Sequence, residues 1–199
     1  MAAGNVIPLF PLHTVLFPGG PLPLRIFEAR YIDMVGRCSR EQAPFGVVLI
    51  QDGDEAGAVA TTATIGCTAR IADFSTLEDG LLGISCVGER KFRVLRVWRE
   101  ADGLNMAEVE LLSPEPGVAL PESFAPLGAA VRRAMDELAE HYAHVEKMPG
   151  DAAWVGSRLA ELLPLQLLDK QLLLEMSDPI ARLEWCQAKV LVVSENVAD

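Results

Sequence analysis

The stretch IPLFPLHTVLFPGGPLPLRIFEARY (residues 7–31) decides the fold of this chain. Prolines interrupt its short apolar runs. Because proline lacks an N–H donor, such runs predict edge strands or irregular extended segments rather than one long helix. We expect extended segments at Val6–Phe10, Val15–Phe17 and Leu22–Phe27, followed by a short helix at Glu28–Ser39, where apolar residues return with helical spacing.

Strand patterns continue up to about residue 112. The continuous apolar run Phe45–Gln51 is typical of a buried strand, whereas residues 65–72 alternate with the period of two of a strand. Asp79-Gly80 then favours a hairpin turn that leads into a strand at Leu81–Val87.

A second hairpin follows, with Lys91–Trp98 and Leu104–Leu112 joined by a turn at Asp102-Gly103. Within the first of these strands, the regular alternation of apolar and polar residues is interrupted. A bulge near Leu95 would place its apolar side chains on one face and its basic side chains on the other.

After the proline-rich segment Ser113–Ser123, the spacing of the apolar residues changes from that of strands to that of helices. An apolar stripe covers residues 127–145, and Asp151 is a plausible cap for a second helix. Shorter patterns predict helices at Asp169–Glu175 and from Asp178-Pro179 onward. We therefore expect an α+β chain with a β-rich lobe (1–112), a linker (113–123) and a helical lobe (124–199).

Composition excludes several classes of protein. Half of the 199 residues are hydrophobic, which indicates a globular chain, and the net charge of −11 disfavours non-specific binding to nucleic acid or anionic membrane. No run of 18 uninterrupted apolar residues is present, so we expect no membrane span. The four scattered cysteines form no CxxC pair and fit a reducing cytoplasm.

The opening of the chain resembles a known family. The segments Ile7–Leu12, Val15–Gly19, Leu22–Leu24 and Ile26–Tyr31 are similar to the start of the N-terminal domain of Lon-type ATP-dependent proteases. The similarity continues in Phe45–Ile50, Ile65-Gly66-Cys67 and Gly88–Arg93. It is looser in the helical half, around Leu162-Leu163-Pro164 and Lys170–Glu175. The resemblance implies a PUA-like β pseudo-barrel followed by a helical bundle.

The same resemblance implies substrate recognition without catalysis. Full-length members add an ATPase and a serine–lysine peptidase, but none of the four lysines follows a glycine, as the phosphate loop requires, and the nucleophile segment of the peptidase is missing. We expect a stand-alone module without cofactor that binds unfolded or tagged polypeptides, with a protease as a further candidate partner. The segment Gly83–Gly88 has one residue too many for a nucleophile elbow, and His141 and His144 suggest no third metal ligand. We therefore predict no catalytic or metal site.

Two surfaces are candidate binding sites. Phe17 and Leu22 flank Pro18-Gly19-Gly20-Pro21, and this loop could offer apolar surface to an extended peptide or simply cover the core. Lys91, Arg93 and Arg96 belong to a basic strand that could bind an anionic partner such as RNA or could be a solvated, ion-paired face. An RNA-binding module is therefore the alternative function, although the acidic chain makes nucleic acid the less favoured partner.

Overall fold

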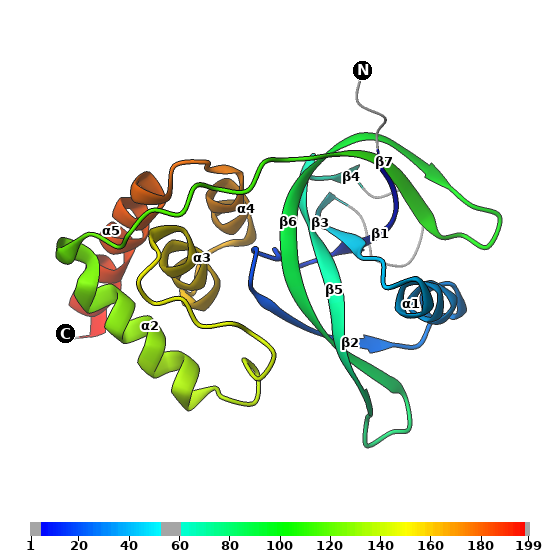
Figure 1. The fold of residues 1–199 in the computed structure, drawn as a ribbon, viewed down its shortest axis with the longest axis horizontal. Helices are drawn as coiled ribbons and strands as arrows, with labels where there is room; N and C mark the ends of the chain where they lie inside the picture. Colours follow the sequence, from blue (N-terminus) through cyan, green and yellow to red (C-terminus); the bar gives the residue numbers. More distant parts are fainter. Residues whose placement is uncertain (1–4, 53–60, 198–199) are drawn as a thin grey trace. The chain divides into compact units, whose positions relative to one another are not determined.

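The computed structural model describes residues 5–52 and 61–197. It divides into two compact units, Met1–Pro114 and Glu115–Asp199 (Figure 1). Among the described residues, strands lie in the first unit with one helix, and the second unit is helical. The expected α+β class is confirmed. The expected boundaries of the lobes (1–112 and 124–199) and of the linker (113–123) stay a prediction.

A single sheet of seven strands forms the first unit. Its elements are β1 (Asn5–Leu12), β2 (Pro21–Ile26), α1 (Ala29–Glu41), β3 (Phe45–Asp52), β4 (Thr61–Thr62), β5 (Ile65–Thr76), β6 (Leu82–Arg99) and β7 (Asn105–Leu111). Neighbouring strands follow the order β1-β7-β6-β5-β3-β4, and β1 also pairs in parallel with β3. The extra pairing joins the two sides of the sheet, so that five strands close into the expected pseudo-barrel.

The prolines of β1 sit where this strand is paired on one side only. Residues Asn5–Leu9 pair with β7, and Leu9–Leu12 pair with β3. Pro8 and Pro11 therefore each have one open side, which accommodates a residue without an N–H donor. The expected edge position is wrong for β1, because it joins two strands, and is confirmed for β2, which pairs with β6 alone.

Side chains that alternate along β1 and β3 fill two separate cores. Leu9 and Val48 pack with Phe92 inside the barrel, whereas Phe10 and Val47 pack in a second cluster with α1. In that cluster the rings of Phe10 and Tyr31 stack with centroids 3.9 Å apart. Burial on both faces explains why β3 reads as a continuous apolar run rather than an alternating one.

Two glycines make room for the largest side chain of the barrel interior, Phe92. A Cβ atom on Gly46 would lie 2.8 Å from the Phe92 ring. A Cβ atom on Gly66 would lie 2.6 Å from the same ring and 2.4 Å from the backbone oxygen of Val47. Because heavy atoms cannot approach this closely, the ring can occupy the interior only if both neighbours lack a side chain.

The long strand β6 replaces the two strands expected over this region. Its first half pairs with β2 and β5, and its second half with β5 and β7. The bulge expected near Leu95 is confirmed by a register shift between Val94 and Arg96. Of the apolar side chains expected to share one face, Phe92 is buried, whereas Leu95 and Val97 are exposed. Val15–Phe17, expected as an edge strand or an irregular extended segment, form a loop outside the sheet.

Four helices and a short 3₁₀ turn, Glu122–Phe124, form the described part of the second unit. The helices are α2 (Ala125–Glu137), α3 (Ala152–Leu162), α4 (Leu167–Glu175) and α5 (Pro179–Val197). The helix α2 ends before the apolar stripe does, and the following turns still bury Tyr142 and Val145. The expected cap is confirmed, because a carboxylate oxygen of Asp151 accepts a hydrogen bond from the N–H of Trp154 at 2.8 Å.

A buried arginine organises the helical unit. Arg182 on α5 is 1% exposed, and its Nη1 and Nη2 atoms donate to the two carboxylate oxygens of Glu115 at 2.9 and 2.6 Å. It also donates to the backbone oxygens of Leu173 and Met176 at the end of α4. This bidentate pair fixes α5 against both α4 and the segment that precedes α2.

The barrel interior yields a direct test of packing. Replacing Gly66 with alanine should lower the free energy of unfolding by at least about 1–3 kcal/mol, because the new methyl group would overlap the backbone of β3 as well as the Phe92 ring. The matched control is Gly150→Ala, where an added Cβ meets no atom within 4 Å. Urea denaturation followed by circular dichroism should separate the two variants. Equal stability would show that the close approach does not matter.

Candidate functional site

The predicted peptide-binding side chains Phe17 and Leu22 are buried. They are 1% and 8% exposed, so neither presents an apolar surface in this structure. Their loop is held to β6, because Gly19 N–H donates to the Gly88 oxygen at 2.7 Å and Gly88 N–H donates to the Gly20 oxygen at 2.9 Å. The loop therefore covers the core.

The predicted basic face is engaged in contacts within the chain. Lys91 is buried at 8% exposure. Arg93 donates to Glu110 at 2.6 Å, and the Arg96 guanidinium lies 5.0 Å from the Trp98 ring centroid. A face whose cations already have partners within the protein is a weak attractor for phosphate.

Exposed apolar side chains of the first unit lie elsewhere than at the loop of Phe17 and Leu22. They are Val6, Phe27, Ile32, Phe74, Leu95 and Val97. Scattered residues of this kind are ordinary on a protein surface. A binding site needs, in addition, a concave shape and polar groups that orient a ligand.

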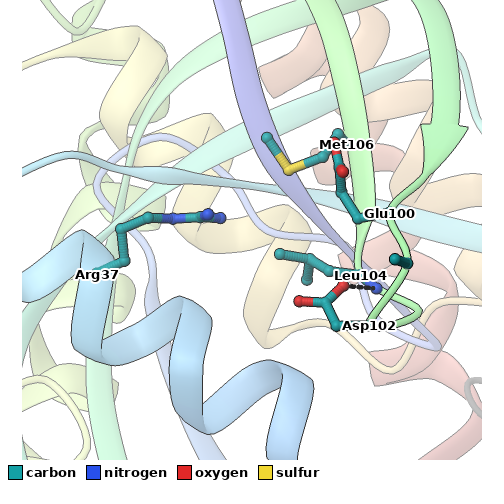
Figure 2. A pocket seen from close by; sticks show the side chains of 6 residues that line it. Arg37, Glu100, Asp102, Leu104 and Met106 are labelled. Atoms are coloured by element: carbon teal, nitrogen blue, oxygen red, sulfur yellow. Dashed lines mark hydrogen bonds between the residues drawn. The ribbon is translucent and has the colours of Figure 1, made fainter.

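A pocket of about 310 Å³ in the first unit has both properties (Figure 2). It lies between α1 and the hairpin of β6 and β7, and its lining residues are Arg37, Glu100, Ala101, Asp102, Leu104 and Met106. Figure 2 shows the Arg37 side chain reaching from α1 toward Leu104 and Met106. Apolar side chains thus line the pocket together with one guanidinium and two carboxylates.

The hairpin side of the pocket is held rigidly by its turn. The N–H groups of Leu104 and Gly103 donate to the Asp102 carboxylate and to the Glu100 oxygen, each at 2.9 Å. Gly103 has a φ of 87°, a conformation that favours glycine, and the turn expected at Asp102-Gly103 is confirmed.

Two arginines fasten this turn to the rest of the unit. Arg30 on α1 and Arg99 on β6 both donate to the Gly103 oxygen at 3.0 Å. Arg30 also forms an ion pair with Glu28 at 2.7 Å and lies over the Tyr31 ring. These contacts hold α1 and the hairpin together, and so they set the width of the pocket.

Arg37 carries the chemically unusual atom of the pocket. Its Nη2 atom is shielded from solvent and has no hydrogen-bond partner among residues 5–52 and 61–197. A buried donor left without an acceptor costs about 1–3 kcal/mol, so such atoms are rare in folded proteins. A rotation of the Arg37 side chain, which lines the pocket, would bring this donor to an acceptor there and remove the cost.

The lining contains no nucleophile with an adjacent base. Cys38 and Cys86 are buried in the core beside α1, and burial raises the pKa of both thiols, that of Cys86 to about 12. Within the described part of the chain, no group of three or more His, Cys, Asp or Glu side chains is arranged to hold a metal ion. The pocket side chains include one guanidinium, two carboxylates and apolar groups, which can form hydrogen bonds and apolar contacts.

Sequence reasoning missed Arg37. The available signal was its spacing, because Arg30 and Arg37 are seven residues apart and so lie on one face of the predicted helix. Spacing alone cannot show that one guanidinium finds partners on the hairpin while the other leaves a donor unused.

Comparison with known proteins shows similarity over nearly the whole chain. The family model of the ATP-dependent protease La (LON) substrate-binding domain matches residues 6–188. The crystal structure of the Lon N-terminal domain protein from Xanthomonas campestris has 38% sequence identity and a TM-score of 0.75, and the match covers 92% of this chain and 98% of that one. The N-terminal domain of the Lon protease of the Mycobacterium avium complex shares the fold at 18% identity, with a TM-score of 0.61 over 92% of this chain and 96% of that one.

Longer proteins are similar over about half of the chain. Protein cereblon of Danio rerio is 32% identical over 57% of this chain, and Lon protease 2 of Myxococcus xanthus is 30% identical over 49%. The matches cover 28% and 12% of those two proteins. A related segment therefore occurs within larger proteins of more than one kind.

The paired basic face leads to a prediction for Arg93 and Arg96. Changing both to serine removes one exposed ion pair and one cation–π contact, so the free energy of unfolding should fall by about 1 kcal/mol. Neither the parent nor the variant should bind single-stranded RNA in a filter assay. Micromolar RNA binding by the parent that weakens steeply with salt and is lost in the variant would contradict this reading.

Proposed function

The chain belongs to the ATP-dependent protease La (LON) substrate-binding domain family, and on this basis we propose that it binds extended or unfolded polypeptides and performs no catalysis of its own. The observation that carries the proposal is the match of the family model over residues 6–188. A solved structure of a relative, which this chain covers almost completely, supports it. A family defined by substrate binding supplies the role, and the pocket of the first unit supplies a place for it.

The absence of catalysis is part of the same proposal. No glycine precedes any of the four lysines in the sequence, so the chain has no Gly-Lys step of a phosphate loop. The pocket side chains include a guanidinium, carboxylates and apolar groups, which suit hydrogen bonding and apolar contact. We expect purified protein neither to hydrolyse ATP nor to cleave casein.

A segment similar to part of this chain occurs in different larger proteins, and this supports a recognition role. Cereblon and Lon protease 2 both contain a segment similar to part of this chain, within proteins several times longer than the match. A module that recurs beside different partners supplies binding rather than one reaction. On this reading, the chain presents bound polypeptides to a protease or to another processing partner.

The cysteines favour a reducing compartment, and we place the protein in the cytoplasm. Cys38, Cys67, Cys86 and Cys186 are all free and buried. Free thiols of this kind are usual where glutathione keeps proteins reduced. Among the described residues, none of the helices is both long and apolar enough to cross a membrane.

Binding to an unfolded protein tests the proposal. Reduced lysozyme whose thiols are blocked with iodoacetamide should bind with roughly micromolar affinity, and native lysozyme should not, because only the unfolded chain exposes its apolar side chains and main chain. The two forms have the same sequence and nearly the same charge, so electrostatic attraction cannot explain a difference. Equal binding of both forms, or of neither, in isothermal titration calorimetry would contradict the proposal.

A further inference from the structure

The pocket beside α1 brings together the groups that the main chain of a peptide requires. Its donor is the Arg37 guanidinium, whose Nη2 atom has no hydrogen-bond partner within residues 5–52 and 61–197. This atom is shielded from solvent, so it reaches a ligand only when the side chain rotates toward the pocket. Its acceptors are carboxylate oxygens. One oxygen of Asp102 accepts from Leu104 N–H, and one oxygen of Glu100 accepts from the Trp98 indole N–H. The second oxygen of each carboxylate accepts no hydrogen bond in the described part of the chain.

Apolar side chains stand between these polar groups. Leu104 is almost fully buried and packs in the core beside α1, and Met106 is partly buried at the edge of that core. Methionine is flexible and polarisable, and so it adapts to side chains of different shapes. A volume of about 310 Å³ is at the small end of ligand pockets, which suits one apolar side chain with its flanking peptide groups.

The charges of the lining argue against a free anion as the ligand. Arg37, Glu100 and Asp102 all line the pocket, so the lining has two negative charges for one positive charge. The guanidinium groups of Arg30 and Arg99 beside it donate to the Gly103 oxygen, and Arg30 is also paired with Glu28. A phosphate or a terminal carboxylate would be repelled by both acidic groups. A peptide group carries no net charge and offers a carbonyl oxygen and an N–H group together, which matches a donor and acceptors side by side.

We propose that this pocket holds the main chain of an extended polypeptide around one apolar residue, with Arg37 donating to a peptide carbonyl oxygen while Asp102 and Glu100 accept from peptide N–H groups. The inference rests on the proposed function and assigns to it a site and a ligand class. Recognition through main-chain groups and a single apolar side chain depends little on sequence. It requires an extended segment, which native proteins rarely expose.

The variant Arg37→Met tests this assignment. Methionine keeps much of the length and apolar volume of the side chain and removes the donor. Binding of the iodoacetamide-blocked, unfolded lysozyme should weaken about tenfold, since hydrogen bonds to charged groups are among the stronger ones in proteins. Because the lost donor has no partner among the described residues, the urea midpoint should equal or exceed that of the parent.

Arg40→Met is the matched control. Arg40 lies on the same helix one turn further along and is exposed, so this variant removes the same charge from the protein and should bind the unfolded chain as the parent does. If both variants weaken binding equally, overall charge is responsible and the pocket assignment is wrong.

Two further outcomes distinguish a failure of the pocket assignment from a failure of the proposed function. If the parent binds unfolded lysozyme and Arg37→Met binds it equally well, the pocket assignment fails while the proposed function stands. If the parent does not bind, both fail. Acetate or inorganic phosphate should displace no more of the unfolded lysozyme than sodium chloride does at the same ionic strength. Specific displacement would identify an anion site and overturn the proposal.

Discussion

The packing of the Phe92 ring against Gly46 and Gly66 is the constraint on which the first unit depends. The ring fills the barrel interior, and a side chain on either glycine would overlap it. Phe92 lies on β6, whereas the glycines lie on β3 and β5, so one contact holds three strands at a fixed spacing. With β3 and β5 fixed, β1 can pair with β3 on one side and β7 on the other, and the sheet closes.

Closure of the sheet has a consequence for binding, because it fixes where the hairpin of β6 and β7 stands relative to α1. Arg30 and Arg99 complete this arrangement by donating to the same oxygen at Gly103. The pocket is thus formed between two elements that are held independently of any ligand. A preformed pocket loses little conformational freedom when a ligand binds, which would favour the binding that we propose for it.

Local patterns in the sequence predicted local features well. The positions of α1 and β2, the turns at Gly80 and Gly103, the bulge near Leu95 and the cap at Asp151 each depend on a few neighbouring residues. The parallel pairing of β1 with β3 could not be read in the same way, because it joins segments more than 30 residues apart. Nor could residues 82–99 be recognised as one strand, since β6 changes partners along its length.

The candidate binding sites illustrate the same limit. Phe17 and Leu22 are apolar in sequence whether they face solvent or the core, and only the hydrogen bonds of their loop to Gly88 show that they cover the core. Likewise, the charge of Lys91, Arg93 and Arg96 does not reveal that one is buried and the others have partners. Arg37 is the reverse case, an ordinary helical arginine in sequence whose unused donor exists only in the folded chain.

Methionine methyl resonances measure most directly whether an unfolded chain binds at this pocket. Met106 lines the pocket, Met148 is exposed in the helical unit, and Met34 and Met135 are buried. In protein labelled with ¹³C at its methionine methyl groups, adding unfolded lysozyme should shift the Met106 signal and leave that of Met148 in place. A shift at Met148 without one at Met106, or no shift at concentrations where calorimetry shows binding, would contradict the account.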